Sequence, residues 1–247
     1  MVLNDTAWML LFLLLPVAAF FYASVGHGGA SSYLMLLALF QVDPLQIRPA
    51  ALLLNMFVSG FAFLTYRKTC QFQHRLFWPL VLFSVPAAFV GGSIVIEAEL
   101  YRKILGVLLL FPVARFLSIF PENKEFKMVR KFWMAPLLGF LIGFMSGLIG
   151  IGGGILLSPV LLLTGWASMR ETAAMSALFI FLNSASGFLG AGAFHPAIGT
   201  ELWLLTPGTV AAGMLGAWYG AFRFNLKTLR YLLTSVLLFA SVKLLLT

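Results

Sequence analysis

The length of its apolar runs constrains this chain of 247 residues more than any other feature. Of ten apolar runs, eight have 17 residues or more, roughly the minimum for a helix that crosses a bilayer. Residues are 61% hydrophobic and 10% charged, against about 25% charged in a soluble domain. This composition excludes almost any water-soluble enzyme and predicts an all-α polytopic membrane protein. The eight long runs are Trp8–Val25, Ala50–Tyr66, Leu76–Ile96, Ile104–Phe120, Trp133–Ile149, Thr172–Ala193, Trp203–Phe222 and Leu229–Leu246.

Two runs are too short to cross a bilayer alone. Ala30–Phe40 has 11 residues and Ile155–Trp166 has 12, and each follows a glycine cluster. The clusters are Gly26-His27-Gly28-Gly29 and Gly150-Ile151-Gly152-Gly153-Gly154. Each short run and the run before it form either one broken crossing or a hairpin that enters and leaves on the same side.

The sequence repeats itself. At an offset of 125 residues, Trp8 matches Trp133, Gly28 matches Gly153 and Trp78 matches Trp203. Shared apolar composition explains matches of leucine with leucine but not these matches of tryptophan and glycine. We predict one transmembrane domain over 1–247, with repeat 1 at about 8–120, a cytoplasmic linker at 121–132 and repeat 2 at about 133–246. Secondary transporters are commonly built from such repeats.

The distribution of Lys and Arg chooses between the two topologies. Cytoplasmic loops are enriched in these residues. Hairpins would make the repeats inverted and divide the loop charges 11 to 4, whereas broken crossings would make them parallel and divide the charges 8 to 7. We therefore expect two inverted repeats, each a glycine-tipped helical hairpin plus three transmembrane helices, with both termini extracytoplasmic and Cys70 cytoplasmic. The 11 residues expected in the cytoplasm are Arg67, Lys68, Arg75, Lys124, Lys127, Arg130, Lys131, Arg170, Arg223, Lys227 and Arg230.

The glycine clusters predict an anion site. Non-helical backbone at membrane depth occurs only where it is buried in protein or lines a cavity. The short helices that follow, near Ala30 and Ile155, would direct free N–H groups and the positive ends of their dipoles at the tips, which suits an anion. The alternative is that the glycines only allow tight helix packing. The predicted substrate-binding residues here are His27, Gly28, Gly29, Ala30, Ser31, Gly152, Gly153, Gly154 and Ile155.

Four polar residues inside the long runs are added to this predicted site: Asn55, Ser59, Asn183 and Ser186. They could bind the oxygens of an anion, or could form only hydrogen bonds between helices. His27 could donate to an anion, could titrate and couple transport to protons, or could only pack. No Asp or Glu lies in the middle of a crossing, which argues against a carboxylate relay or cation site.

Two arginines precede comparable long runs. Arg48 and Arg170 could attract an anion to entrances on opposite faces, or could be boundary anchors at the membrane surface. His27, His74 and His195 are too scattered in sequence to indicate zinc, so we expect no metal. We expect no cofactor either. No phosphate-binding loop of the Walker type is present, so the chain is not expected to hydrolyse ATP by that route. The net charge of +8 reflects basic cytoplasmic loops and does not require a nucleic-acid partner.

A family resemblance rests on these same residues. The stretch Gly147–Gly154 followed by Ser158-Pro159, together with Arg170–Ala174, Asn183–Gly187 and Ser24–Gly29, resembles the TauE/SafE sulfite-exporter family over roughly residues 8 to 246. The resemblance implies a permease of the bacterial inner membrane for sulfite, organosulfonates or related anions, usually with eight transmembrane segments. The first cluster departs from the fuller glycine run of the second, which leaves open whether both tips bind substrate equally.

Our hypothesis is therefore a secondary transporter of small sulfur-containing anions that works by alternating access around a midplane site. An anion channel using the same paired hairpins is the alternative. An enzyme is not expected, since neither a His-Glu-x-x-His motif nor a Gly-x-Ser-x-Gly elbow occurs. The expected partners are a small anion, the lipid bilayer and a second copy in a homodimer.

Overall fold

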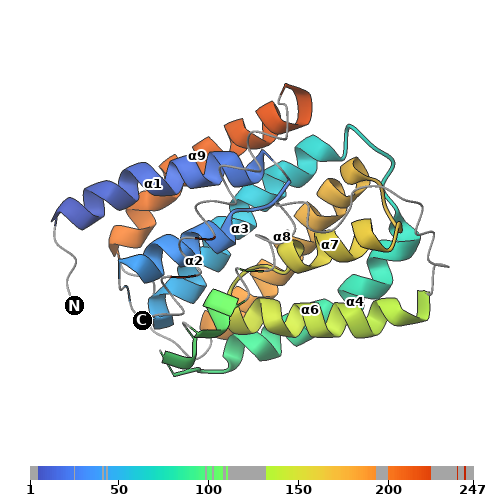
Figure 1. Cartoon of the computed structure of the whole chain (residues 1–247), viewed down its shortest axis with the longest axis horizontal. Coiled ribbons are helices and arrows are strands. Elements are labelled where there is room, and N and C mark those ends of the chain that lie inside the picture. The colour runs from blue at the N-terminus through green and yellow to red at the C-terminus, as the bar shows by residue number, and fades with distance from the viewer. Residues whose placement is uncertain are drawn as a thin grey trace.

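The computed structural model describes residues 5–24, 26–40, 42, 44–97, 99–101, 103–107, 110, 132–192, 200–223, 238 and 242. Nearly all of the last apolar run, most of 104–120, nearly all of the linker at 121–132 and His195 lie outside these residues. The described part is helical and contains no strand, which confirms the all-α prediction. Its helices (Figure 1) are α1 Asp5–Ala23, α2 Ala30–Leu39, α3 Pro44–Tyr66, α4 His74–Ser93, η1 Phe132–Met134, α6 Ala135–Ile149, α7 Gly154–Leu163, α8 Met169–Gly192 and α9 Thr200–Phe222.

Three of the described helices are long and apolar enough to cross a membrane: Leu45–Tyr66 in α3, His74–Ser93 in α4 and Arg170–Gly192 in α8. Large apolar side chains also point outward from the bundle. Met9 is 72% exposed, Trp133 71% and Leu82 70%, which would be unfavourable in water but suits contact with lipid. The chain is therefore a multi-pass membrane protein.

The two short apolar runs form the two short helices. α2 and α7 have 10 residues each, so each is about 15 Å long, half of the roughly 30 Å hydrocarbon core. In Figure 1, α1 runs from left to right and α2 returns to the left, whereas α6 begins at the right and α7 returns there. The two helical hairpins therefore enter the bundle from opposite ends.

Helices of the two halves interlock. α4 packs against α6, α1 against α9, and α3 crosses α8 in the centre. In the α4–α6 contact, Gly139, Gly143 and Gly147 lie against the backbone of Leu80, Ser84 and Ala88, so a Cβ at any of these glycines would overlap a carbonyl oxygen. Gly216 and Gly220 of α9 lie in the same way against Phe20 and Ser24. Residue numbers rise together along both contacts, so the two helices of each pair run parallel. Their small residues let the two backbones approach closely, as is common between helices in membranes.

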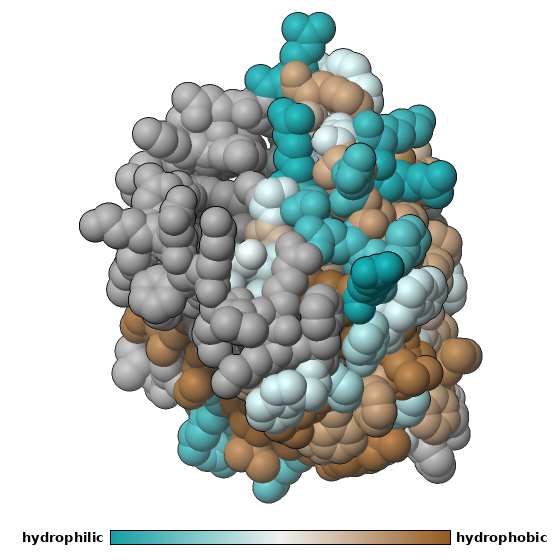
Figure 2. Space-filling view, turned by 90° about the vertical axis from the view of Figure 1, so that its right-hand side faces the viewer, coloured by the Kyte–Doolittle hydropathy of each residue, from teal (hydrophilic) through white to brown (hydrophobic). Residues whose placement is uncertain are grey.

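Hydrophilic side chains gather at one end of the bundle. Figure 2 views the molecule from the right-hand side of Figure 1 and shows most of them over its upper part; apolar side chains cover most of the lower part, where a smaller hydrophilic group also lies. The exposed Arg67 and Lys68 follow α3, Arg75 lies at the start of α4, Arg170 at the start of α8 and Arg223 just after α9. All five belong to the set expected in the cytoplasm.

Candidate functional site

Asn55 stands in the middle of α3, with eleven helical residues on either side. Its side chain is 1% exposed. Its Oδ1 accepts a hydrogen bond from the backbone N–H of Ala30 at 3.2 Å, and its Nδ2 donates to Ser184 Oγ on α8 at 3.0 Å. One side chain therefore joins the start of α2 to the central helix of the second half.

Both glycine clusters reach Asn55. We call Gly26–Gly29 the first glycine segment and Gly150–Gly154 the second. A Cβ at Gly28 would overlap Asn55 Oδ1, and a Cβ at Gly152 would overlap Asn55 Nδ2. Ile180 of α8 also touches both positions. The structure thus brings together Gly28, Gly152 and Asn55, three of the residues predicted from the sequence.

The short helices begin at this meeting place. Gly29 has φ 95° and is the N-cap of α2, and Gly152 and Gly153 have φ 71° and 77° just before α7. Residues with a Cβ rarely adopt these angles. Ser31 in the first turn of α2 is 1% exposed, and Ile155 in the first turn of α7 is 5% exposed. The N–H groups of these first turns already have acceptors in part, since Ala30 N bonds Asn55 Oδ1, Ser32 N bonds Gly29 O and Leu156 N bonds Gly153 O. Two helix starts, with the positive ends of their dipoles, thus lie beside Asn55.

His27 extends the polar cluster to α7 and α8. Its Nε2 lies 3.2 Å from Ser158 Oγ on α7. Ser158 Oγ lies 2.8 Å from Ser176 Oγ on α8 and donates to Gly154 O at 2.8 Å. Ser158 and Ser176 were missed as site residues. Ser176 lies two helical turns before Asn183 on the same face of α8, and that spacing is the signal that could have found it.

The other predicted polar residues make different contacts. Ser59 Oγ donates to Met56 O of its own helix at 3.3 Å, and Asn183 Nδ2 donates to Phe179 O at 2.8 Å. Asn183 Oδ1 is buried and has no hydrogen-bond partner among the described residues. Ser186 Oγ donates to Val85 O on α4 at 2.6 Å. None of these bonds reaches Asn55, whereas Ser184, next to Asn183, does.

Arg48 and Arg170 occupy unlike positions. Arg170 is the second residue of α8 and is exposed, whereas Arg48 is the fifth residue of α3 and is 4% exposed. The Arg48 guanidinium donates to Ile94 O at 2.8 Å, Gly92 O at 3.1 Å, Gly91 O at 3.2 Å and Gly147 O at 3.1 Å. A cation at the C-terminal ends of helices satisfies their last carbonyls and complements their dipoles. The geometry makes Arg48 a cap of α4 and α6; an entrance role for either arginine stays a prediction.

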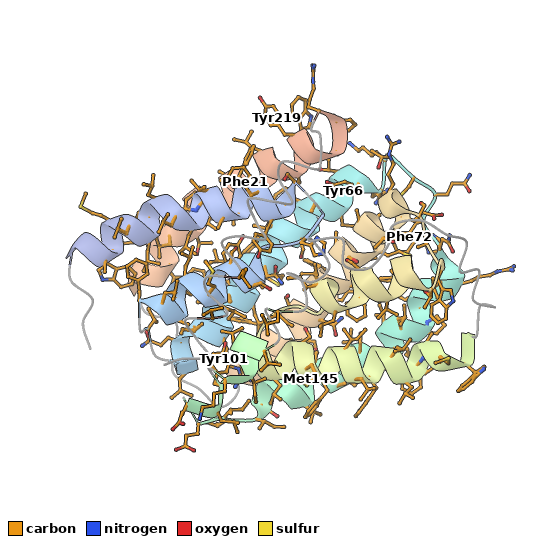
Figure 3. All side chains as sticks on the ribbon, viewed as in Figure 1. Phe21, Tyr66, Phe72, Tyr101, Met145 and Tyr219 are labelled. Atoms are coloured by element: carbon orange, nitrogen blue, oxygen red, sulfur yellow. The ribbon has the colours of Figure 1, made fainter. Side chains whose placement is uncertain are left out.

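Two tyrosines hydrogen-bond to the ends of α1 and α6, the longer helices of the two hairpins, which we call their long arms. The Tyr66 hydroxyl donates to Ser24 O at the end of α1 at 3.0 Å, and the Tyr101 hydroxyl donates to Ile149 O at the end of α6 at 2.9 Å. Figure 3 shows the two tyrosines on opposite sides of the bundle. Each hairpin therefore has its long arm fixed near one end and the start of its short helix near the centre.

Charge is sparse around Asn55. Among the described residues no group of three or more His, Cys, Asp and Glu could hold a metal ion. The donors around Asn55 are neutral amides and hydroxyls, helix N–H groups and one imidazole.

Outside the membrane-spanning segments, burial raises the pKa of the Cys70 thiol. Nearby Glu171 raises this pKa further, and Arg170 opposes the shift.

Known proteins place the chain in a family. The model of the family described as "Sulfite exporter TauE/SafE" matches residues 11–244. A "Probable membrane transporter protein y4hK" of Sinorhizobium fredii (strain NBRC 101917 / NGR234) is 33% identical over 235 residues, 93% of this chain and 94% of that protein. A "Probable membrane transporter protein YunE" of Bacillus subtilis (strain 168) is 37% identical over 84 residues, 32% of this chain and 29% of that protein. No solved structure matches the chain. The chain is a member of the TauE/SafE sulfite exporter family, a family of membrane transporters.

Proposed function

We propose that this protein is a secondary transporter of small sulfur-containing anions, such as sulfite or organosulfonates, and that it acts without catalysis. One observation carries the proposal. Glycine segments from both halves meet at Asn55 in the middle of α3, where α2 and α7 begin. Donors without a carboxylate competitor favour an anion over a cation. The sulfur chemistry of the proposed substrate comes from the description of the family as a sulfite exporter.

Alternating access around this site is part of the proposal. The two hairpins enter from opposite ends (Figure 1), and the pairing of α1 with α9 corresponds to the pairing of α6 with α4. Both observations support two inverted repeats that rock about the crossing of α3 and α8. The exposed basic residues at one end support a cytoplasmic location of that end, hence extracytoplasmic termini in a bacterial inner membrane. A homodimer stays a prediction.

An anion panel tests the substrate class. Purified protein is melted with sulfite, sulfate, thiosulfate, sulfoacetate, taurine and acetate, and uptake of each stabilising anion is then measured in proteoliposomes. We expect stabilisation by at least one sulfur-containing anion and saturable counterflow of it. Stabilisation by cations or sugars alone would overturn the substrate class, and linear conductance far above a carrier's turnover would replace the carrier with a channel.

A matched pair of glycine variants tests the location. Gly28→Leu places a side chain on Asn55, whereas a Cβ at Gly192, the last residue of α8, meets nothing within 4 Å. We expect Gly28→Leu to insert in the membrane and lose transport, and Gly192→Leu to keep it. Normal transport by Gly28→Leu would move the site elsewhere.

A further inference from the structure

Asn183 on α8 carries a buried amide oxygen that receives no hydrogen bond from the described residues. Its side chain is 0% exposed, and its Nδ2 donates to Phe179 O at 2.8 Å. A carbonyl oxygen can only accept, so the amide nitrogen faces Phe179 and the amide oxygen faces away from it. A buried acceptor without a donor is rare in proteins and costs free energy. The orientation of the amide is therefore fixed, and the atom left over is an acceptor.

Ser146 on α6 supplies a second group of this kind. Its side chain is 0% exposed, and its Oγ has no hydrogen-bond partner among the described residues. Its Cβ lies 3.3 Å from the point that a Cβ of Gly153 would occupy. Ser146 therefore borders the second glycine segment, with a hydroxyl that can accept as well as donate.

Asn183 borders the same place from the side of α8. Phe179, one helical turn before it, lies 2.8 Å from the point that a Cβ of Gly153 would occupy, and Gly187, one turn after it, lies against α6. Residues four apart share one face of a helix. Asn183 therefore faces α6 and the second glycine segment, where Ser146 also lies.

The first half uses its corresponding amide oxygen differently. Asn55 and Asn183 each precede a Ser-Gly pair by about one helical turn. Asn55 Oδ1 accepts from the N–H of Ala30, the first residue of α2, whereas Asn183 Oδ1 does not accept from Gly154, the first residue of α7. The asparagine of the first half thus holds a helix start, and that of the second half leaves its oxygen for a different donor.

We propose that Asn183 and Ser146 accept a hydrogen bond from a donor group that the transported anion itself carries, and that they select anions with such a group. This inference rests on the proposed function. The anionic oxygens lie at the start of α7, where the helix dipole is positive, and the O–H or N–H of the same molecule reaches the two acceptors. The substrate class is then a sulfonate with a hydroxyl or amino group near the sulfur, in preference to a plain alkanesulfonate.

Two probes of nearly the same size test this preference. Hydroxyethanesulfonate and n-propanesulfonate differ by a hydroxyl in place of a methyl group, and both carry one negative charge at neutral pH. Calorimetry and competition for uptake into proteoliposomes measure their relative affinities. We expect the unmodified protein to prefer hydroxyethanesulfonate by about fivefold or more, because the alkyl probe leaves the buried acceptors unpaired. A smaller or reversed preference would overturn the inference.

Variants connect the preference to the two side chains. Asn183→Leu keeps the approximate size of the side chain and removes its acceptor, and Ser146→Ala removes only a hydroxyl. The matched control is Ser84→Ala, since Ser84 on α4 is also buried but its Oγ donates to Val81 O of its own helix. We expect the preference to fall at least about fivefold in Asn183→Leu and at least about twofold in Ser146→Ala, and to stay unchanged in the control. An unchanged preference in both site variants would overturn the inference.

Two further measurements separate the inference from a folding defect and from the proposed function. Ser146→Ala removes a buried hydroxyl that has no partner among the described residues, so its melting temperature should not fall, and a lost preference in a stable variant reports on binding. Uptake of sulfite without a preference for hydroxyethanesulfonate would overturn this inference and leave the proposed function standing. Failure to transport any sulfur-containing anion would count against the proposed function itself.

Discussion

The two glycine segments occupy comparable places in the two halves but meet different neighbours. A Cβ at Gly26 would lie 2.7 Å from Ala173 Cβ, whereas a Cβ at Gly150 would lie 3.4 Å from the backbone of Arg48. The first segment thus faces an alanine and carries His27, while the second faces an arginine that fastens α4 to α6. The comparison indicates that the first segment carries an imidazole, whereas the second packs against the arginine that caps α4 and α6.

Removing the arginine should have the largest effect. Arg48→Met leaves four backbone carbonyls at the ends of α4 and α6 without the guanidinium. Each buried polar group left unpaired costs about 1–3 kcal/mol, so we expect a loss of roughly 3 kcal/mol or more in the free energy of unfolding. Denaturation in detergent measures it. Arg170→Met, at an exposed arginine, should change it by less than about 0.5 kcal/mol. Equal losses would show that burial of Arg48 does not matter.

Replacing a glycine with alanine should have the next largest effect, and this effect should differ between the two glycine segments. Gly152→Ala meets Asn55 and Ser184 and also forces a side chain to φ 71°, whereas Gly28→Ala meets Asn55 at an ordinary backbone angle. We expect both to lower transport at least about tenfold, and Gly152→Ala to lose a further ~1–2 kcal/mol of stability. Transport and thermal unfolding are the measurements, with Gly192→Ala as control. Equal stability of the two variants would contradict the role of the backbone angle.

A double-mutant cycle should show that Asn55 is the shared contact. Asn55→Ala removes its bonds to Ala30 and Ser184, at about 1–3 kcal/mol. It also makes room, so Gly28→Ala should cost less in the Asn55→Ala protein. The coupling should be about 0.5–3 kcal/mol, and smaller for Asn183→Ala with Gly28→Ala. Strict additivity in the Asn55 cycle would place Gly28 away from Asn55.

The smallest expected effect is a change in the rate at which maleimide labels Cys70. Its Sγ lies 3.6 Å from Arg170 O, at the end of the bundle where Gly26 meets Ala173. Burial and Glu171 raise the pKa of the thiol, so maleimide labelling of membrane fragments should be slow near neutral pH and accelerate as pH rises. Glu171→Gln removes a negative charge that favours the neutral thiol, and should speed labelling about twofold. Labelling of intact cells by an impermeant maleimide would reverse the proposed topology.

Local sequence patterns predicted the features of this fold that depend on residues close together in the sequence. Run length and glycine content predicted the short helices α2 and α7 and the breaks before them, because bilayer thickness and backbone sterics act on the chain locally. The inverted arrangement stays a prediction that the opposing hairpins support. The burial of Arg48 could not be predicted, because its acceptors at Gly91 and Gly147 lie 43 and 99 residues away. The same holds for the bond between His27 and Ser158, 131 residues apart.

The parallel contacts of α1 with α9 and α4 with α6 also bear on how the chain is made. A ribosome delivers α1 long before α9, and α1 and α4 of the first half pack against the glycine-bearing α9 and α6 of the second half. Each half emerging into the membrane must therefore wait, incompletely packed, for the other. We expect the nascent first half to depend on insertion machinery or surrounding lipid until α9 arrives, and the two repeats to be inseparable as folding units.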